Sequence, residues 1–287
     1  MSAPPPLHFV TRFAPSPTGL PHRGHAFSAL TAFHAARAAG GRLLLRIEDI
    51  DAARCRAQFE ATILDDLAWL GLEWETPPRR QSEHLSDYRH ALERLAARGL
   101  IYRCFKTRAQ VLADIGRAPH EPTAAYRGSA LAPPAETHLL DEGRPFAWRL
   151  SLTAARQALG DFSGLAFMEE GAGPNGENGV IAADPERCGD IILGRKDLGV
   201  AYHLAVVVDD ALQGISHVIR GADLFEATHV QRLLQALLDL PTPVYRHHRL
   251  LLRPDGKRFA KRDRAETLAD LRAGGVSAAA LRGELGF

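Results

Sequence analysis

The chain has 287 residues, 46% of them hydrophobic and 24% charged, which is ordinary for a globular protein of one large or two modest domains. Lysine and arginine number 35 against 34 acidic residues, and the resulting net charge of +1 neither indicates nor excludes a nucleic-acid partner. No apolar run reaches the roughly 18 residues that span a bilayer, and the N-terminus lacks a signal-peptide pattern. Three scattered cysteines indicate no disulfide framework, so we expect a cytoplasmic protein.

Strand and helix patterns alternate over residues 1–102, where we place the first half of the main domain. An apolar stretch at residues 8–13 predicts a buried strand, and an alanine-rich helix over 22–39 ends at a Gly-Gly pair. Residues 42–47 predict a second strand. Amphipathic helices follow at residues 56–70 and 86–98. This alternation predicts an α/β fold built on a parallel sheet.

The middle of the chain, residues 103–187, differs because prolines and glycines are frequent and helical periodicity weakens. We expect an inserted small α+β subdomain there, with an exposed loop at residues 171–179. The α/β pattern returns over residues 188–245, the expected second half of the main domain. Its elements are apolar stretches at 190–193, 200–208 and 217–220 and a helix at 225–238. Residues 246–287 predict the end of a strand, a basic loop and two short helices.

The turn between the first predicted strand and helix carries the first candidate site. It is Arg12-Phe-Ala-Pro-Ser-Pro-Thr-Gly19, followed by His22-Arg-Gly-His25. Ligands of open α/β sheets bind at strand carboxyl ends, where a helix N-terminus offers N–H groups and a positive dipole end to a phosphate. His22 and His25 share one face of the first turn, and Gly24 leaves room for a nucleotide. Without further context, a His-x-x-His pair is more often a surface feature of a tight turn.

Three other stretches carry charged residues in positions suited to a binding site. Arg46-Ile-Glu48-Asp-Ile-Asp51 places Glu48 at the end of a predicted strand, and Arg220 follows another apolar strand. A basic loop near the end of the chain is Gly256-Lys-Arg-Phe-Ala-Lys261-Arg-Asp263. Taken alone, the acidic stretch is more often a solvated loop, and the basic loop is more often a solvated or RNA-contacting patch. A structural ion pair is the less favoured alternative for Arg220.

Together these stretches resemble class I aminoacyl-tRNA synthetases. R-F-A-P-S-P-T-G with H-x-x-H is similar to their first signature in its glutamyl/glutaminyl form, and R-I-E-D-I-D stands where that branch has R-I-E-D-T-D. Residues 258–262 align with the second signature, K-L-S-K-R in this branch, with Ala260 in place of serine. The resemblance extends from Arg12 to the last helices and implies a Rossmann-type parallel-sheet catalytic core with an inserted subdomain.

The resemblance also implies a reaction in which ATP, with Mg²⁺, activates glutamate as an adenylate that is then passed to RNA. It implies that His22, Gly24 and His25 bind ATP and that His22, His25 and Lys261 stabilise charge as pyrophosphate leaves. The glutamate ligands that it implies are Arg12, Ala14, Ser16, Glu48, Tyr202 and Arg220. Arginine suits the two carboxylates, but which arginine takes which carboxylate stays open. An ion pair of Arg220 with Asp210 or Asp223 is the structural alternative.

The identity of the acceptor depends on the segment after Lys261. Only two short helices are expected there, at residues 265–273 and 277–285, with no anticodon-binding domain. This form, and the run Arg220-Gly-Ala-Asp-Leu224, resemble the glutamyl-queuosine tRNA(Asp) synthetases, which attach glutamate to queuosine at the wobble position of tRNA(Asp). The resemblance implies L-glutamate and queuosine-bearing tRNA(Asp) as partners, no membrane contact, and a monomer.

Members of this family often bind zinc in the insertion through C-x-C and Y-x-x-x-C. Here Cys104 remains, but Lys106 and Ala130 stand at the places of the other cysteines. One thiolate cannot hold tetrahedral zinc, so we predict no zinc and interpret Cys104 as a packed residue. Basic residues at 246–249, 253 and 257–264 form a candidate phosphate-contacting face.

Three alternatives remain open. One is a shortened glutamyl-tRNA synthetase that charges a tRNA 3′ end. Another is a non-catalytic module that binds RNA or an amino acid, against which the retained His22, His25 and Lys261 argue. The third is an adenylating enzyme for a different acid.

Overall fold

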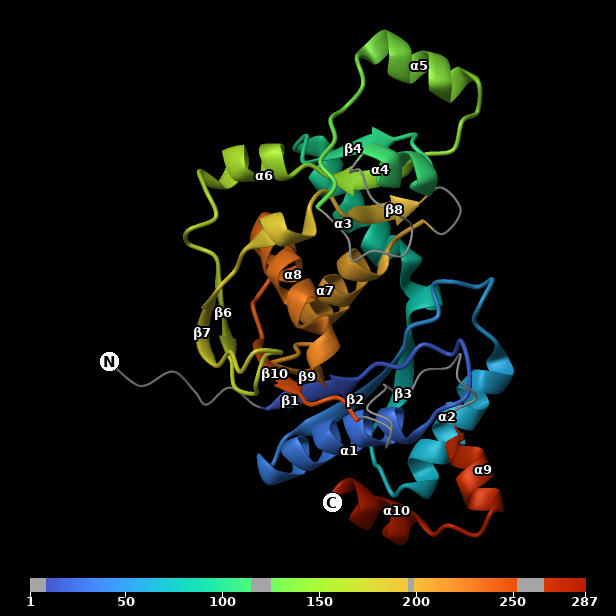
Figure 1. Cartoon of the computed structure of the whole chain (residues 1–287). Coiled ribbons are helices and arrows are strands. Elements are labelled where there is room, and N and C mark those ends of the chain that lie inside the picture. The colour runs from blue at the N-terminus through green and yellow to red at the C-terminus, as the bar shows by residue number, and fades with distance from the viewer. Residues whose placement is uncertain (1–8, 115–124, 196–198, 252–265) are drawn as a thin grey trace.

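The computed structural model of the protein describes residues 9–114, 125–195, 199–251 and 266–287 (Figure 1). Two sheets, one parallel and one mainly parallel, lie side by side at its centre. The first has the order β1-β2-β3, formed by Val10–Phe13, Arg42–Ile47 and Glu75–Arg80. The second has the order β7-β6-β10-β9, formed by Gly179–Ala182, Ala166–Glu169, Val244–His248 and His217–Gly221, with β7 antiparallel. The sheets adjoin at β1 and β9, where Ser216 N donates to Val10 O at 3.0 Å.

Helices cover both faces of the central sheets. Successive side chains of a strand point to opposite sides, so each face carries apolar side chains that pack against helices. Leu44 packs into one core with three helices, α3 (Leu85–Ala97), α7 (Tyr202–Leu212) and α8 (Phe225–Leu237). Leu43 and Leu45, its neighbours on β2, pack into the other core. The helices of that core are α1 (Arg23–Ala38), α2 (Ala57–Trp69), α9 (Leu268–Ala273) and α10 (Ala278–Leu285). The predicted α/β fold with a parallel sheet is confirmed.

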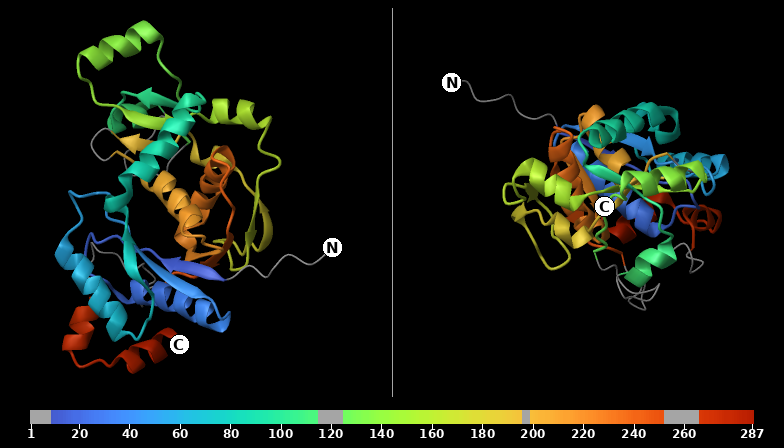
Figure 2. Two further views of the ribbon diagram at one scale, coloured as in Figure 1. Left: turned by 180° about the vertical axis from the view of Figure 1, so that it is seen from behind. Right: turned by 90° about the horizontal axis from the view of Figure 1, so that it is seen from above.

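A small antiparallel sheet lies at the end of the molecule opposite α9 and α10 (Figures 1 and 2). Its order is β4-β5-β8, formed by Ile101–Cys104, Ala147–Leu150 and Ile192–Arg195. The helices of this part of the chain are α4 (Arg108–Asp114), α5 (Pro133–Asp141) and α6 (Leu152–Leu159). Short 3-10 turns complete the elements at Gln81–His84, Pro185–Cys188 and Ala222–Leu224.

Some strands pair across the expected boundary between the insertion, which ends at residue 187, and the second half of the main domain, which begins at residue 188. The hairpin β6–β7 comes from the expected insertion but joins the central sheet through β10. Conversely, β8 lies beyond residue 188 and pairs with β5 in the small sheet.

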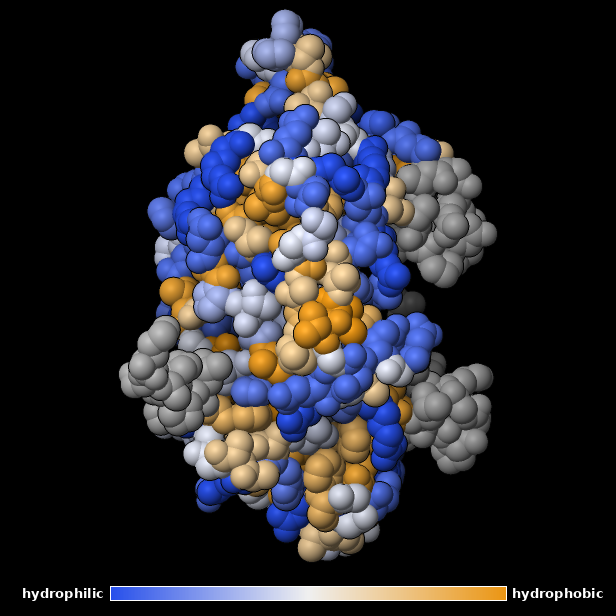
Figure 3. Space-filling model, turned by 90° about the vertical axis from the view of Figure 1, so that its left-hand side faces the viewer, coloured by the Kyte–Doolittle hydropathy of each residue, from blue (hydrophilic) through white to orange (hydrophobic). Residues whose placement is uncertain are grey.

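Figure 3 shows the side of the molecule that carries β6 and β7, where apolar residues stand among polar ones. Met168 and Val180 of this hairpin are exposed.

Two elements differ from the sequence-based expectation. The apolar stretch at 200–208, grouped with the strand-like stretches, belongs mainly to helix α7. Its residues Leu204–Val208 are all buried, and a helix buried on all sides has the same unbroken apolar run as a buried strand. Strand β3 was not predicted because it contains Pro77 and Pro78, which strands tolerate at a sheet edge. No helix of the described residues is both long and apolar enough to cross a membrane.

Candidate active site

The N-terminus of α1 is capped by two histidines. The N-cap residue His22 accepts a hydrogen bond at Nδ1 from Gly24 N at 3.1 Å, and His25 Nδ1 accepts from His22 N at 3.1 Å. The two rings lie 3.9 Å apart, centroid to centroid. A neutral imidazole that accepts at Nδ1 carries its proton on Nε2. Both rings are therefore set up as donors beside a helix N-terminus, the arrangement that suits a phosphate.

A cavity of about 370 Å³ opens beside these histidines, a volume within the range of small-molecule sites. Its walls come from the β1–α1 turn, the end of β9 and the segment after β10. They include Ala14, Ser16, His22, Gly24, His25, Gly221, Asp223, His248, Arg249 and Leu251. A Cβ added at Gly24 would lie 2.9 Å from Cε1 of His22, so any larger residue there would displace the ring.

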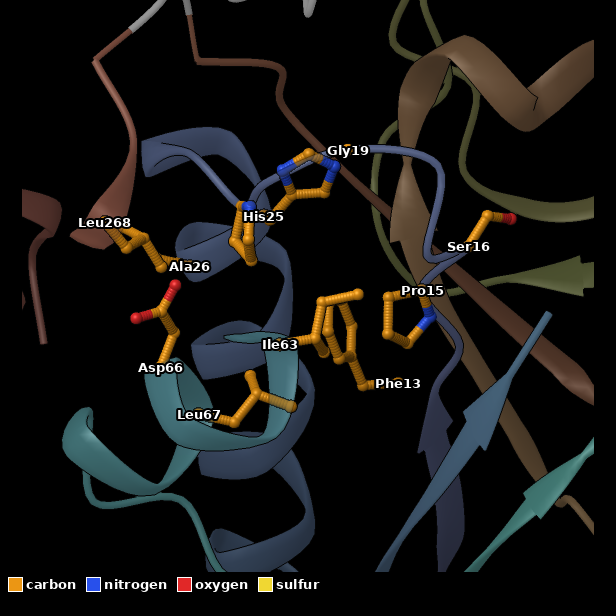
Figure 4. A pocket seen from close by; sticks show the side chains of 11 residues that line it. Phe13, Pro15, Ser16, Gly19, His25, Ala26, Ile63, Asp66, Leu67 and Leu268 are labelled. Atoms are coloured by element: carbon orange, nitrogen blue, oxygen red, sulfur yellow. The ribbon is translucent and has the colours of Figure 1, made fainter. Parts of the chain in front are cut away.

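A second, much smaller cavity lies beneath His25, between α1, α2 and α9 (Figure 4). It holds about 10 Å³, enough for one water at most. Asp66 lines it, fully buried, with Arg272 3.6 Å from its carboxylate, and burial raises the pKa of Asp66 to about 6 although Arg272 lowers it. We assign this cavity to helix packing and not to a ligand.

One buried carboxylate, that of Asp210, holds two arginines at the carboxyl edge of the sheet. Asp210 accepts from Arg12 Nε at 3.0 Å and from Arg46 Nη2 at 2.5 Å. Glu48, at the end of β2, is partly buried, and this burial raises its pKa to about 7 although Arg46 and Arg12 act in the opposite direction. A cation bound beside Glu48 would favour its ionised form.

Arg220 differs from Arg12 because its partners are neutral. Its Nη2 donates to Thr228 Oγ1 at 2.7 Å, and its Nε to His247 Nε2 at 3.1 Å. Its Nη1 is buried without a hydrogen-bond partner. Among the residues that the structure describes, no carboxylate forms an ion pair with Arg220, so the alternative pairing with Asp210 or Asp223 is wrong. A buried guanidinium nitrogen without a partner is costly, and a ligand carboxylate would satisfy it.

Tyr202, the first residue of α7, lies among these charges. Burial raises the pKa of its hydroxyl, and the charged groups that act on it include Arg220, Glu48 and Arg12. The structure thus brings four sequence-predicted glutamate ligands together. Ala14 and Ser16 line the neighbouring cavity.

Lys261 lies outside the described residues, as do positions 253 and 257–264 of the candidate phosphate-contacting face. The described residues on either side are near the site. Leu251 lines the cavity, and Thr267 forms a β-bridge with His22.

His247 is buried, contrary to the prediction for it, and its partner Glu169 was not predicted. We expected His247 on a phosphate-contacting face, but it is 2% exposed and its Nδ1 lies 2.5 Å from Glu169 Oε2. The alternation of side chains along a strand could have predicted that His247 is buried. Tyr245 and His247 lie on the buried face of β10, while Arg246 and His248 are less buried. No local pattern could have predicted that Glu169 is the partner of His247, because the two residues are 78 positions apart in the sequence.

The residues at the place where members of the resembled family often bind zinc form a different arrangement. Cys104 is 6% exposed and packs with Tyr102, Val111 and Tyr126, which confirms it as a packed residue. Lys106 forms an ion pair with Asp114 at 2.6 Å. Over the described part of the chain, no three His, Cys, Asp or Glu side chains are grouped to hold a metal ion.

Comparison with known proteins places this site in a family. The sequence model of "tRNA synthetases class I (E and Q), catalytic domain" matches residues 8–152 and 175–282. The glutamyl-Q tRNA(Asp) synthetase of Rhodobacter capsulatus is 47% identical over 285 residues, which cover 97% of this chain and 100% of that protein. The chain belongs to the glutamyl-Q tRNA(Asp) synthetase family. That of Symbiobacterium thermophilum is 42% identical, over 96% of this chain and 85% of its own length.

Solved structures of class I synthetases agree with this assignment. The glutamate-tRNA synthetase of Elizabethkingia anophelis superposes with a TM-score of 0.72 at 27% identity, over 89% of this chain and 53% of that one. This chain thus spans about half the length of that synthetase. Family membership makes the protein a ligase of the aminoacyl-tRNA synthetase type, and the predicted Rossmann-type fold class is confirmed.

Proposed function

We propose that the protein activates L-glutamate with ATP as glutamyl-adenylate and transfers it to queuosine at the wobble position of tRNA(Asp). The observation that supports glutamate activation best is the buried, unpartnered Nη1 of Arg220. Arg220, Glu48 and Arg12 all act on the Tyr202 hydroxyl, so a cation for a carboxylate and an anion for an ammonium meet in one site. An amino acid with a second carboxylate matches this set of charges.

In the proposed binding mode, each polar group of glutamate meets an opposite charge. Glu48 binds the α-ammonium, which favours ionised Glu48 over the protonated form that burial promotes. Arg220 binds one carboxylate through Nη1, and the Tyr202 hydroxyl donates to the substrate. Arg12 faces the second carboxylate while Asp210 keeps its guanidinium in place.

ATP is proposed to lie in the cavity beside α1. The Nε2–H groups of His22 and His25 and the helix N-terminus stabilise the negative charge that develops when a glutamate carboxylate attacks the α-phosphate. Lys261 is proposed to act on the departing pyrophosphate. Mg²⁺, bound to the phosphates, supplies further charge neutralisation. The reaction needs no protein nucleophile, because positioning and electrostatics suffice.

Relatives support the acceptor. The two glutamyl-Q tRNA(Asp) synthetases above match over nearly the whole chain at 47% and 42% identity. The second candidate is transfer to the 3′ end of a tRNA. It is supported by the glutamate–tRNA ligase of Prochlorococcus marinus, which is 36% identical over 94% of this chain and 56% of its own length.

Two assays test the proposal in sequence. ATP–pyrophosphate exchange without tRNA should depend on glutamate and exceed exchange with aspartate or glutamine. No exchange with any acid would favour a non-catalytic binding module, and faster exchange with another acid would replace the substrate. Labelled glutamate should then transfer to tRNA(Asp) that contains queuosine and not to tRNA(Asp) that lacks it. Equal transfer to both would reject queuosine and point to the 3′ end.

A further inference from the structure

Arg220 is the first member of a buried chain of hydrogen bonds that continues through His247 to Glu169. Arg220 Nε donates to His247 Nε2 at 3.1 Å, and His247 Nδ1 lies 2.5 Å from Glu169 Oε2. The second carboxylate oxygen, Oε1, accepts from the backbone N–H groups of His247 at 2.9 Å and Gly171 at 2.8 Å. Arg220 is 5% exposed, His247 2% and Glu169 1%, so water has little access to the chain.

The donors and acceptors of this chain permit one arrangement of protons. A guanidinium can only donate, so Nε2 of His247 accepts and carries no proton. The proton of the neutral ring is therefore on Nδ1, which donates to Glu169. Burial lowers the pKa of His247 and keeps the ring neutral, although its hydrogen bond to Glu169 acts in the opposite direction. Burial also disfavours ionised Glu169, but hydrogen bonds from His247 and Gly171 outweigh it and lower the pKa of Glu169.

This proton arrangement determines where the Arg220 guanidinium points. His247 holds its Nε, and Thr228 Oγ1 accepts from Nη2 at 2.7 Å. Two hydrogen bonds in the plane of a rigid fork define the orientation of that plane. The remaining nitrogen, Nη1, is buried and has no protein partner.

We propose that Glu169 and His247 are positioning residues of the glutamate site. Glu169 selects the His247 tautomer that accepts from Arg220, and His247 thereby directs Nη1 of Arg220 toward a substrate carboxylate. The inference rests on the proposed activation of glutamate. It adds to that site two residues that lie outside its sequence signatures.

The variant Glu169→Gln tests the selection of the tautomer. The two backbone N–H groups require the amide oxygen of glutamine, so its NH₂ group faces His247 Nδ1. The ring must then accept at Nδ1 and carry its proton on Nε2, where it opposes the Nε–H of Arg220. We expect the KM for glutamate in pyrophosphate exchange to rise about ten-fold or more, because a hydrogen bond to a charged group is lost. The KM for ATP should stay unchanged.

The neighbouring variant Glu170→Gln is the matched control. It makes the same chemical change one residue away, at a side chain that pairs with Arg246 at 2.7 Å on the surface. Both KM values should equal those of the wild type. A general effect of removing a carboxylate from this hairpin would instead appear in both variants.

Nitrogen-15 NMR of the histidine rings reads the tautomer without any assay of activity. His247 should be protonated on Nδ1 in the wild type and on Nε2 in E169Q. If E169Q does not fold, the single variants replace it: His247→Gln should keep the glutamate KM near that of the wild type, and His247→Leu should raise it.

The outcomes separate this inference from the proposed function. A wild-type protein without glutamate-dependent exchange rejects glutamate activation, and the NMR measurement then still decides whether Glu169 selects the tautomer. If the wild type shows normal exchange but E169Q keeps the wild-type glutamate KM or the wild-type tautomer, the positioning role is rejected. The proposed activation of glutamate is then unaffected.

Discussion

Replacing Glu48 with glutamine should make the unliganded protein more stable and the enzyme less active. In the unliganded protein, burial raises the pKa of Glu48 from 4.5 to about 7, although Arg46 and Arg12 lower it. The folded state therefore binds a proton at Glu48 more tightly than the unfolded chain does. By linkage, the stability that protonated Glu48 contributes is fully present below pH 4.5 and is lost as the pH rises through about 7.

The size of the effect follows from the pKa change. Each pKa unit corresponds to about 1.4 kcal/mol, so ionised Glu48 costs the unliganded fold at most about 3.5 kcal/mol well above pH 7. Solvent screening of a partly exposed carboxylate reduces this value. Glutamine resembles the protonated form, so Glu48→Gln should raise the free energy of unfolding by up to about 3 kcal/mol near pH 8 and hardly at all below pH 4.5.

The same carboxylate should make glutamate binding depend on pH. Only ionised Glu48 attracts the α-ammonium, so the wild-type KM for glutamate should rise about ten-fold for each unit that the pH falls below the pKa. In Glu48→Gln the KM should be higher and independent of pH over this range. Pyrophosphate exchange at saturating ATP measures the KM, and urea unfolding of both proteins measures stability. A wild-type KM that is constant between about pH 6 and 8, or a variant no more stable near pH 8, would refute this reasoning.

Two further substitutions test other parts of the structure. Gly24→Ala puts a Cβ 2.9 Å from Cε1 of His22, so the ring must move. The KM for ATP should rise about ten-fold, and the KM for glutamate should stay unchanged. Equal changes in both KM values would contradict a role of Gly24 in nucleotide binding alone. Asp209 is fully buried and accepts from Arg79, Gln81 and Tyr88. Asp209→Asn removes the buried carboxylate that accepts from Arg79, Gln81 and Tyr88, although Arg79 keeps its ion pair with Asp87. It should cost about 1–3 kcal/mol in urea unfolding; a loss below about 0.5 kcal/mol would show that the network reorganises.

Local sequence patterns predicted the first helix and the second strand, because both depend on the residues within and beside them. The helix at residues 22–39 was recognisable from its alanines and its Gly-Gly end, and the structure has it at Arg23–Ala38. The strand at residues 42–47 was predicted with the bounds that it has in the structure. In contrast, helix α7 was grouped with strand-like stretches because full burial removes the polar face that distinguishes a helix from a strand.

By itself, the sequence determined the family and the motif residues, because its two signatures and the segments between them are contiguous strings. Tertiary structure alone decided which charges compensate one another. Asp210 pairs with Arg12, while Arg220 is held by His247 and Thr228 and keeps one nitrogen without a protein partner. The partner of His247 is Glu169, 78 residues earlier. Such pairings depend on which strands become neighbours in the folded sheet, and β6 and β10 are neighbours although a long stretch of chain lies between them.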